Sequence, residues 1–236
     1  MKTKAVLFDL DGTLLPMDQE IFVKAYIGGL IKAATPRGYE PKQLANAIQA
    51  GTYAMIKNTG EMTNEGAFWN CMSSVYGRSV IEEFSFFEEF YRTDFQRVKE
   101  VCGICPRAKE LLKLIKAKGL RAVLATNPLF PSVATESRIR WAGLDPCDFE
   151  FFTSYENSHY CKPNPEYYRE VLAKTNLAPE ECIMVGNDTD EDMIAETLGM
   201  KVFLLTDCLI NRSSKDISAY PNGNIDELIE FMEMLD

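Results

Sequence analysis

Two aspartates, Asp9 and Asp11, follow a short apolar segment near the start of the sequence, and Gly12 comes directly after them. The segment at residues 5–8 is apolar without alternation, which is typical of a strand buried on both faces of a parallel sheet. Ligands bind beyond the carboxyl ends of such strands. Two carboxylates at this spacing can divide a phosphoryl transfer, since one can attack phosphorus while the other carries a proton for the leaving oxygen. On this stretch alone, a polar turn that closes a strand is an equally good interpretation.

Three more sets of polar residues lie after predicted strands or in a loop on the same edge of the sheet. They are Thr126 with Asn127, Lys162, and Asp188 with Asp192. The net charge of −10 means that any phosphate must be held by local cations, so a lysine and a metal site are expected. Lys162 is the lysine that this pattern offers, and Pro163 holds its main chain extended. Each set alone also has a structural interpretation: a Thr-Asn-Pro turn, a solvated lysine, or acids that complement a helix dipole.

Strands that alternate with helices must position these residues. Residues 17–101 contain few strand signals and four helical segments, at residues 18–31, 41–56, 63–76 and 80–97. Further helices are expected at 108–118, 139–142, 165–172, 189–198 and 225–235, and further strands at 120–125, 149–153, 182–185 and 201–205. We therefore predict an α/β fold, a Rossmann-like doubly wound parallel sheet with an inserted all-α module. The aromatic residues of that module are expected to be mostly core, with some available to line a substrate pocket.

Composition limits the kind of protein. The 236 residues, 46% of them hydrophobic, suffice for a substantial core, and no apolar run approaches the roughly 18 residues of a membrane span. We expect a soluble, cytoplasmic protein without a signal peptide. The acidic balance and the absence of a dense basic run argue against nucleic acid and membrane as partners. The seven scattered cysteines are expected to be reduced thiols, and the single histidine, His159, to be structural.

In this order and spacing the four sets resemble the motifs of the haloacid dehalogenase superfamily. Those motifs are D-x-D-G-T, a strand-end Ser or Thr, a Lys, and a G-D-x-x-x-D loop, and Phe8-Asp-Leu-Asp-Gly-Thr-Leu-Leu15 is the most specific match. The resemblance covers residues 1–16 and 102–236, the predicted catalytic core. Residues 17–101 match the family's α-helical C1-type cap in position and length. Asn187 departs from the pattern, because many members have Gly-Asp directly, and it leaves the register of the metal ligand open by one residue.

The resemblance implies a role for each residue. Asp9 would be the nucleophile that forms an aspartyl phosphate. Asp11 would protonate the leaving alcohol and later deprotonate the attacking water. The Thr126 hydroxyl and the Asn127 N–H would bind oxygens of the transferring phosphoryl group. Lys162 would neutralise the charge of that group and of the Asp9 carboxylate.

Mg²⁺ is the implied cofactor. A helix starting near residue 189 would place Asp188 and Asp192 on one face, where two like charges repel unless a cation lies between them. Oxygen ligands suit Mg²⁺, which takes one or two carboxylates and keeps several waters. The implied ligands are Asp9, the backbone carbonyl of Asp11, Asp188 and, through water, Asp192. A calcium-binding EF loop is excluded, because Met193 and Gly199 occupy the positions that need glycine and glutamate.

The presence of Asp11 bears on the reaction, since dehalogenating and phosphonate-cleaving members of the family lack an acid there. The resemblance therefore implies a Mg²⁺-dependent phosphatase that hydrolyses a small phosphorylated metabolite through an aspartyl-phosphate intermediate. A phosphomutase of the β-phosphoglucomutase kind is the alternative, and a non-catalytic phosphate-binding protein is a third hypothesis. Substrate choice is expected to depend on the cap, where Lys57, Asn58 and Arg78 are candidates. Both a monomer and a homodimer are compatible with the sequence.

Overall fold

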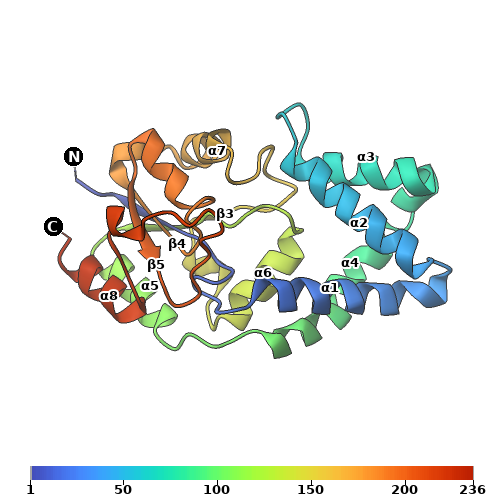
Figure 1. The fold of residues 1–236 in the computed structure, drawn as a ribbon, viewed down its shortest axis with the longest axis horizontal. Helices are drawn as coiled ribbons and strands as arrows, with labels where there is room; N and C mark the ends of the chain where they lie inside the picture. Colours follow the sequence, from blue (N-terminus) through green and yellow to red (C-terminus); the bar gives the residue numbers. More distant parts are fainter. Residues whose placement is uncertain (1, 236) are drawn as a thin grey trace.

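The computed structural model describes the main chain of residues 2–235 and, within that range, the side chains of all residues except 78 and 79. Six parallel strands form one sheet in the order β3-β2-β1-β4-β5-β6 (Figure 1). Their bounds are β1 Ala5–Phe8, β2 Arg121–Leu124, β3 Phe151–Phe152, β4 Cys182–Gly186, β5 Lys201–Leu205 and β6 Asn222–Gly223. The first strand is central, with β2 on one side and β4 on the other. The predicted parallel α/β sheet is confirmed.

Alternate side chains of β1 enter two separate hydrophobic cores, one on each face of the sheet. The helices that cover the sheet are α5 Ala108–Ala117, α6 Ser132–Trp141, α7 Pro165–Thr175 and α8 Ile225–Glu233. Val6 and Phe8 belong to the core that includes residues of α5, α6 and α8. Ala5 and Leu7 belong to the core formed with α7. All four side chains are fully buried, as expected for a strand covered by helices on both faces.

Four of the α-helices between β1 and β2 precede α5 and form the right-hand part of Figure 1. They are α1 Gln19–Ala34, α2 Pro41–Ile56, α3 Asn64–Tyr76 and α4 Phe84–Arg92. Asp18 caps α1 by accepting hydrogen bonds from two main-chain N–H groups, and Pro41 opens α2, as the sequence predicted. The aromatic side chains of Phe87, Phe90 and Phe95 are buried in the core shared with the sheet. Phe95 contacts Phe130 and Trp141, so the helical insertion packs against α6 and the loop before it through aromatic residues.

Two chain segments that connect this insertion to the sheet run side by side. Met17 and Cys102 form an antiparallel bridge. The N–H of Gly103 donates a hydrogen bond of 2.7 Å to the main-chain oxygen of Pro16. The domain boundaries predicted between residues 16 and 17 and between 101 and 102 fall within this paired segment, and they stay a prediction.

The fourth helix of the insertion is shorter than the helix predicted over residues 80–97. Segments of 3-10 helix, Arg78–Ile81 and Asp94–Val101, flank it on both sides. Thr93 ends α4, because its main chain leaves the helical region at φ −118° and ψ −89°. Its hydroxyl donates a hydrogen bond of 2.8 Å to the main-chain oxygen of Glu89. Threonine side chains that bond the main chain in this way compete with helix continuation.

The prediction that an α-helix starts near residue 189 is wrong. Residues 189–192 form turns, and Met193–Leu198 is a 3-10 helix. The carboxylate of Asp188 accepts hydrogen bonds from the N–H groups of Asp190 and Glu191 at 2.7 and 3.0 Å. Side-chain bonds of this kind offer the main chain an alternative to an α-helix.

The segment 211–224 contains the 3-10 helix Ile217–Ala219 and the sixth strand, β6. This strand is only two residues long, so it is too short to produce a hydrophobic pattern in the sequence.

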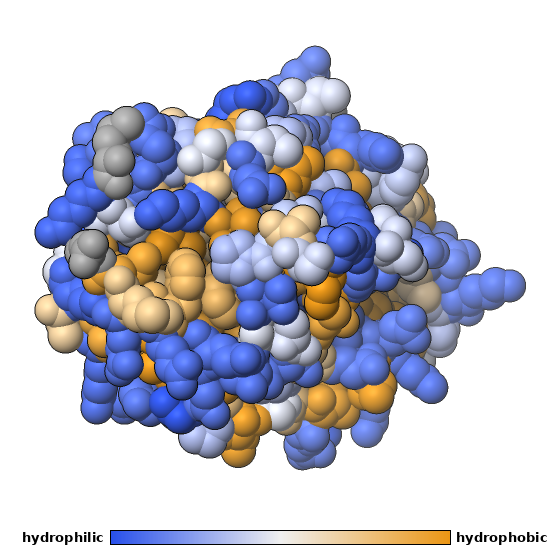
Figure 2. Space-filling view, turned by 60° about the vertical axis from the view of Figure 1, so that its left-hand side comes forward, coloured by the Kyte–Doolittle hydropathy of each residue, from blue (hydrophilic) through white to orange (hydrophobic). Residues whose placement is uncertain are grey.

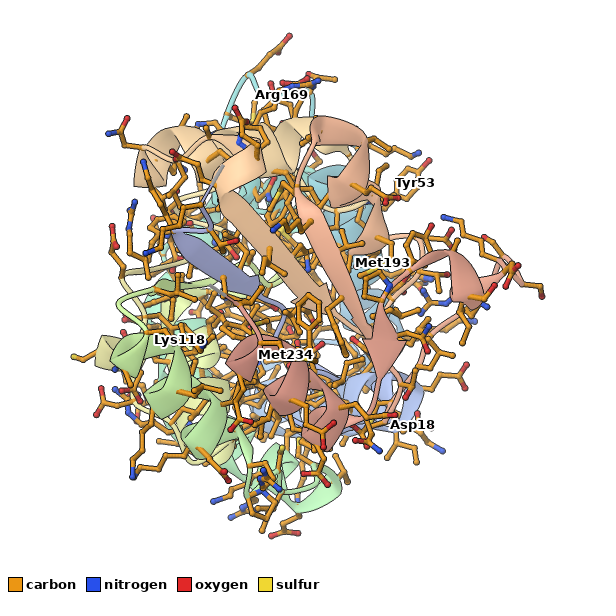
Figure 3. The ribbon with its side chains drawn as sticks, turned by 90° about the vertical axis from the view of Figure 1, so that its left-hand side faces the viewer. Asp18, Tyr53, Lys118, Arg169, Met193 and Met234 are labelled. Carbon is orange, nitrogen blue, oxygen red and sulfur yellow. The ribbon has the colours of Figure 1, made fainter. Side chains whose placement is uncertain are left out.

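The carboxyl end of α8 packs beside the end of α5, where Figure 3 labels Lys118 and Met234. The ammonium group of Lys118 donates hydrogen bonds to the main-chain oxygens of Glu233 and Leu235 at 2.7 and 2.6 Å. A cation at this end of a helix satisfies carbonyl groups that have no partner within the helix and complements its dipole.

Several smaller predictions also hold. The seven cysteines are free thiols. His159 lies in a structural pair, with its Nδ1 2.7 Å from the Glu170 carboxylate. Figure 2 shows a face on which hydrophilic side chains prevail, with hydrophobic areas between them. Within residues 2–235, no helix combines the length and apolar character that crossing a membrane requires.

Candidate active site

The Asp9 carboxylate lies at the carboxyl end of β1, as the sequence predicted. Hydrogen bonds between main-chain groups continue the sheet at this point, since Asp9 N–H donates to Val185 and Ala125 N–H donates to Phe8. Only 7% of Asp9 is exposed. One carboxylate oxygen lies 3.0 Å from Nζ of Lys162, and the other accepts a hydrogen bond of 3.2 Å from the Thr13 hydroxyl. These contacts fix the carboxylate in a buried position at the rim of the sheet.

Lys162 joins two of the predicted site residues. Its Nζ lies 3.0 Å from the Asp9 carboxylate and 2.6 Å from the Asp192 carboxylate. Burial by itself lowers the pKa of a lysine, but the two carboxylates outweigh it and raise the pKa of Lys162 well above its ordinary value. The lysine is therefore a fixed positive charge next to Asp9.

Both carboxylate oxygens of Asp192 have protein partners. One oxygen is bound to Lys162, and the other accepts a hydrogen bond of 3.0 Å from the N–H of Asp188. Burial raises the pKa of Asp192, and the charge of Lys162 opposes that rise. This geometry makes Asp192 a residue that positions Lys162, and its predicted role as a water-mediated metal ligand stays a prediction.

Asn187 and Asp188 are adjacent in the loop after β4. The sequence did not decide which position of this loop supplies the metal ligand. The side chain of Asn187 accepts a hydrogen bond from the Thr13 hydroxyl and donates one to the main-chain oxygen of Cys208. It also fills the space at Gly12, where an added Cβ would overlap it. Asn187 is thereby committed to structural contacts. Asp188, only 4% exposed, is the residue left to contribute a carboxylate.

The oxygen atoms around Asp9 and Asp188 fit the Mg²⁺ that the sequence implied. No group of three or more His, Cys, Asp or Glu side chains within residues 2–235 is arranged around a metal position. The implied set needs only two carboxylates and the Asp11 carbonyl, and two carboxylates with several waters are typical of Mg²⁺. No hydrogen bond among the described residues ends on that carbonyl oxygen. One Asp188 oxygen lies 3.1 Å from the guanidinium of Arg212, which also contacts Gln19 at the start of α1.

Thr126 and Asn127 occupy the end of β2, as predicted. The main-chain oxygen of Thr126 is held by the hydroxyls of Thr153 and Tyr167 at 2.6 and 2.8 Å. Among the described residues, neither the Thr126 hydroxyl nor the Asn127 N–H takes part in a hydrogen bond. Both donors are therefore free to bind an oxyanion.

Glu191 supports Asn127 in a way that the sequence did not indicate. Its carboxylate accepts a hydrogen bond of 3.0 Å from the Asn127 amide, and burial raises the pKa of Glu191 to about 6. A role in complementing a helix dipole was the alternative interpretation of the acids in this loop, and it applied to Asp190 and Glu191. Instead, Asp190 forms an ion pair with Lys215, and Glu191 faces the site.

Arg138, a residue that the sequence analysis did not select, pairs with Asp11. Its guanidinium forms an ion pair with one oxygen of the Asp11 carboxylate, and the other oxygen is buried and has no hydrogen-bond partner within the part of the chain that the structure describes. Arg138 itself is fully buried on α6. Burial raises the pKa of Asp11 to about 6, although the Arg138 charge acts in the opposite direction. A charged residue on the buried face of a helix, next to Ala134 and Ile139, is the signal that could have identified it.

Of the candidate specificity residues of the cap, the structure describes the side chains of Lys57 and Asn58, and their role in specificity stays a prediction. Lys57 is exposed, with its Nζ 5.7 Å from the Tyr53 ring. Asn58 is used within the cap, since its amide donates to Met62 and Asn64. The side chain of Arg78 lies outside the described residues. Asn64, which the sequence did not single out, contacts the main-chain oxygen of Pro128 at 3.3 Å and so links the cap to the loop after β2.

Comparisons with known proteins agree with this geometry. The family model described as haloacid dehalogenase-like hydrolase matches residues 3–195. A phosphoglycolate phosphatase of Vibrio vulnificus is 26% identical over 206 residues, which cover 86% of this chain and 83% of that protein. Pyrophosphatase PpaX of Bacillus cereus is 22% identical over 238 residues, which cover 100% of this chain and 97% of that protein. A magnesium-bound crystal structure of YfnB from Bacillus subtilis shares the fold at a TM-score of 0.58 and 17% identity, covering 99% and 100% of the two chains.

The chain belongs to the haloacid dehalogenase-like hydrolases, since the family model covers most of its length. Its helices α1–α4, inserted between β1 and β2, form the helical cap. The resemblance stated from the four polar motifs is confirmed.

Proposed function

We propose that this enzyme hydrolyses a small phosphate monoester and that Asp9 is the nucleophile. The observation that carries the proposal is the buried Asp9 carboxylate with the Lys162 ammonium 3.0 Å away. The lysine charge stabilises negative charge that an incoming phosphoryl group brings, and the protein has fixed it there before substrate arrives. The free donors of Thr126 and Asn127 lie at the end of the neighbouring strand, β2.

The proposed reaction proceeds in two displacements on phosphorus. Asp9 attacks the phosphoryl group, the bond to the alcohol oxygen breaks, and Asp11 gives that oxygen a proton. Asp11 then takes a proton from the water that attacks the aspartyl phosphate, which regenerates Asp9 and releases inorganic phosphate. Thr126, Asn127 and Lys162 bind the equatorial oxygens throughout.

Asp9, Asp188 and the main-chain carbonyl of Asp11 would hold Mg²⁺, with Asp192 as the predicted water-mediated ligand. The ion supplies positive charge that lowers the cost of bringing an anionic phosphate to two carboxylates. The chain's own contribution is to fix those oxygens, through the Asp190 and Glu191 N–H groups on Asp188 and through Thr13 on Asp9.

The phosphomutase hypothesis uses the same residues and differs only in the acceptor of the phosphoryl group. Water is the acceptor in hydrolysis, whereas a mutase returns the phosphoryl group to a sugar phosphate. The names of the relatives in Vibrio vulnificus and Bacillus cereus, a phosphatase and a pyrophosphatase, favour hydrolysis. We propose residues 17–101 as a cap that closes over the substrate and excludes water, and a monomer or homodimer as the working unit.

Phosphate release tests this function. The purified protein is given sugar phosphates, nucleotides and p-nitrophenyl phosphate, with Mg²⁺ or with EDTA, and Asp9→Asn is the control. We expect release that needs both Mg²⁺ and Asp9, with a loss of at least about 100-fold in the variant, the low end of what a positioned catalytic group contributes. Conversion of a sugar phosphate to an isomer without release would support the mutase, and equal release by Asp9→Asn would refute the assignment.

A further inference from the structure

A large cavity lies where the cap meets the loop after β2. It has a volume of about 550 Å³, within the range of small-molecule sites. Helices α1, α2, α3 and α4 contribute most of its wall, and the remaining wall residues are Leu129, Phe130 and Tyr155. None of its lining residues, all within the described part of the chain, is Asp, Glu, Lys, Arg or His. The wall is mainly aliphatic and aromatic.

The polar atoms of this wall are few and partly satisfied. The hydroxyls of Tyr26 and Tyr91 are bonded to each other at 2.9 Å, so the two residues present mainly their rings. The indole nitrogen of Trp69 is buried and has no hydrogen-bond partner among the described residues. An occupant of the cavity would therefore meet mainly apolar surface, together with this donor and the polar groups of Gln49, Thr52 and Tyr53, which also line the cavity.

The loop of residues 127–130 connects the cavity to the candidate active site, since Leu129 and Phe130 line the cavity and Asn127 belongs to the site. Leu129 donates a main-chain hydrogen bond of 2.8 Å to Asn127, whose N–H is a proposed phosphate ligand. The next residue, Phe130, stacks its ring on the guanidinium of Arg138 at 4.5 Å. Arg138 in turn pairs with Asp11, the proposed proton donor to the leaving oxygen. The organic part of a substrate leaves from that oxygen, and Phe130 and Arg138 are the residues that connect the cavity wall to Asp11.

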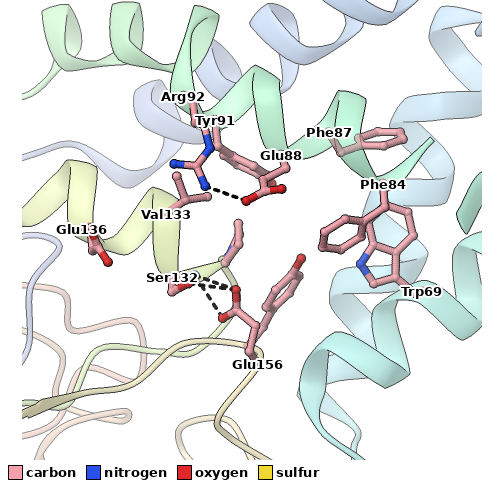
Figure 4. Close-up of a pocket in the computed structure, with 12 residues that line it drawn as sticks. Trp69, Phe84, Phe87, Glu88, Tyr91, Arg92, Ser132, Val133, Glu136 and Glu156 are labelled. Carbon is pink, nitrogen blue, oxygen red and sulfur yellow. Dashed lines mark hydrogen bonds and ion pairs between the residues drawn. The ribbon is translucent and has the colours of Figure 1, made fainter. Parts of the chain in front are cut away.

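A smaller adjoining pocket of about 130 Å³ adds negative charge nearby (Figure 4). It shares Trp69, Phe87, Tyr91 and Tyr155 with the apolar cavity. Its other residues include Glu88, Glu136 and Glu156, and its one cation, Arg92, is paired with Glu88 at 2.6 Å. Among the described residues that line the two spaces, none offers an unpaired cation to a second anionic group of a substrate.

We propose that the apolar cavity binds the organic part of the substrate, and that the substrate class is phosphate monoesters of uncharged, largely apolar alcohols. This inference rests on the proposed phosphatase function. A carboxylate or second phosphate on the organic part would be desolvated against apolar walls and would face the three glutamates, so such substrates are selected against.

A homologous series tests the substrate class. Ethyl, butyl and hexyl phosphate have leaving groups of similar basicity, so differences in kcat/KM report binding of the chain. We expect kcat/KM to rise by about fourfold for each buried methylene, the transfer free energy of one such group. The phosphate ester of 6-hydroxyhexanoate, a hexyl chain that ends in a carboxylate, should lose at least about tenfold relative to hexyl phosphate. The proposal would be overturned if kcat/KM stayed constant or fell from ethyl to hexyl phosphate. Equal kcat/KM for hexyl phosphate and the 6-hydroxyhexanoate ester would also overturn it.

Two variants on α1 provide a matched pair. Val23 lines the cavity and is 50% exposed, whereas Ile21 is 53% exposed and does not line it. Val23→Glu should lower the preference for hexyl over ethyl phosphate by at least about tenfold, because it places a charge at the cavity wall. Ile21→Glu carries the same charge at similar exposure and should leave that preference within about twofold. Equal effects of the two variants would contradict the assignment of the cavity.

Calorimetric binding to Asp9→Asn separates this inference from the proposed function. Hexyl phosphate should bind this variant more tightly than ethyl phosphate by at least about tenfold, whether or not the protein turns over either compound. Tight binding of hexyl phosphate without any turnover by the unmodified enzyme would refute hydrolysis and keep the cavity assignment. Turnover with no preference for hexyl phosphate in rate or binding would keep hydrolysis and refute the cavity assignment.

Discussion

Two buried cations, Lys162 and Arg138, each hold one of the two aspartates that follow β1. Lys162 lies between the carboxylates of Asp9 and Asp192, and Arg138 pairs with Asp11. Breaking a buried ion pair by removing one partner is costly, because the remaining charge stays desolvated. The arrangement therefore gives the two neighbouring aspartates different environments, a requirement for one to act as nucleophile and the other as proton carrier.

Arg138 should act as a positioning residue for the proton transfer by Asp11. We expect Arg138→Met to lower kcat/KM for an alkyl phosphate by about 100-fold, which is in the range that general acid catalysis contributes. With p-nitrophenyl phosphate, whose leaving group needs no proton, kcat/KM should fall by about tenfold or less. Steady-state kinetics on both substrates measure the difference.

The control for this prediction is Asp11→Asn, which should show the same dependence on the leaving group. If Arg138 only supports the fold, Arg138→Met will lower both rates by the same factor, and Asp11→Asn alone will discriminate between the two substrates.

Individual elements show which parts of the fold the sequence could predict. Buried strands such as β1 and β4 are continuous apolar runs, and Asn164 with Pro165 marks the start of α7, so their positions follow from local patterns. The turns at 189–192 depend on the side chain of Asp188, which accepts main-chain hydrogen bonds from Asp190 and Glu191. The local sequence pattern does not predict these hydrogen bonds.

Some site residues could likewise be predicted from local patterns, whereas others depend on contacts between distant parts of the chain. Asp9, Thr126 and Asp188 could be predicted because parallel strands end at one edge of a sheet. Arg138 could not, because its partner Asp11 is 127 residues away in the sequence and only the packing of α6 brings them together. The contact between Asn127 and Glu191, 64 residues apart, is of the same kind.

The end of β4 gives a prediction at the scale of an element. A Cβ at Gly186 would overlap the carboxylate of Asp192, which holds Lys162. We expect Gly186→Ala to destabilise the protein by about 1–3 kcal/mol, typical of overpacking, and to lower activity as Lys162 moves. Urea denaturation and phosphate release measure the two effects.

Gly28→Ala is the matched control for that substitution. Nothing lies within 4 Å of a Cβ at this position, in the middle of α1, so alanine should stabilise the protein by about 0.5–1 kcal/mol. Wild-type stability and activity in Gly186→Ala would show that Asp192 does not need its present position.

At the scale of the whole molecule, the cap is joined to the rest of the chain by the paired segments around Met17 and Cys102 and by contacts of α3 with the loops at Pro128 and Tyr160. Asn64 is the fully buried cap residue at these contacts, with its amide near the main-chain oxygens of Pro128 and Tyr160. The loop that it contacts also carries the proposed phosphate ligand Asn127. Cap position and substrate binding should therefore be coupled.

Asn64→Leu tests that coupling. We expect KM to rise about five- to tenfold, corresponding to a loss of about 1–1.4 kcal/mol in binding, while kcat changes little. Asn70→Leu, an exposed position on the same helix, should leave KM unchanged. A KM equal to that of the unmodified enzyme in Asn64→Leu would show that this contact does not govern substrate binding.

The central claim, that Asp9 forms a covalent phosphoryl intermediate, is tested most directly by trapping it. The enzyme is mixed with substrate and Mg²⁺, quenched in acid, reduced with borohydride and mapped by peptide mass spectrometry, since reduction converts an aspartyl phosphate to homoserine. The account predicts homoserine at position 9 in the turning-over enzyme and none when substrate is omitted. Phosphate release with no modification at Asp9, or with the modification at another carboxylate, would contradict it.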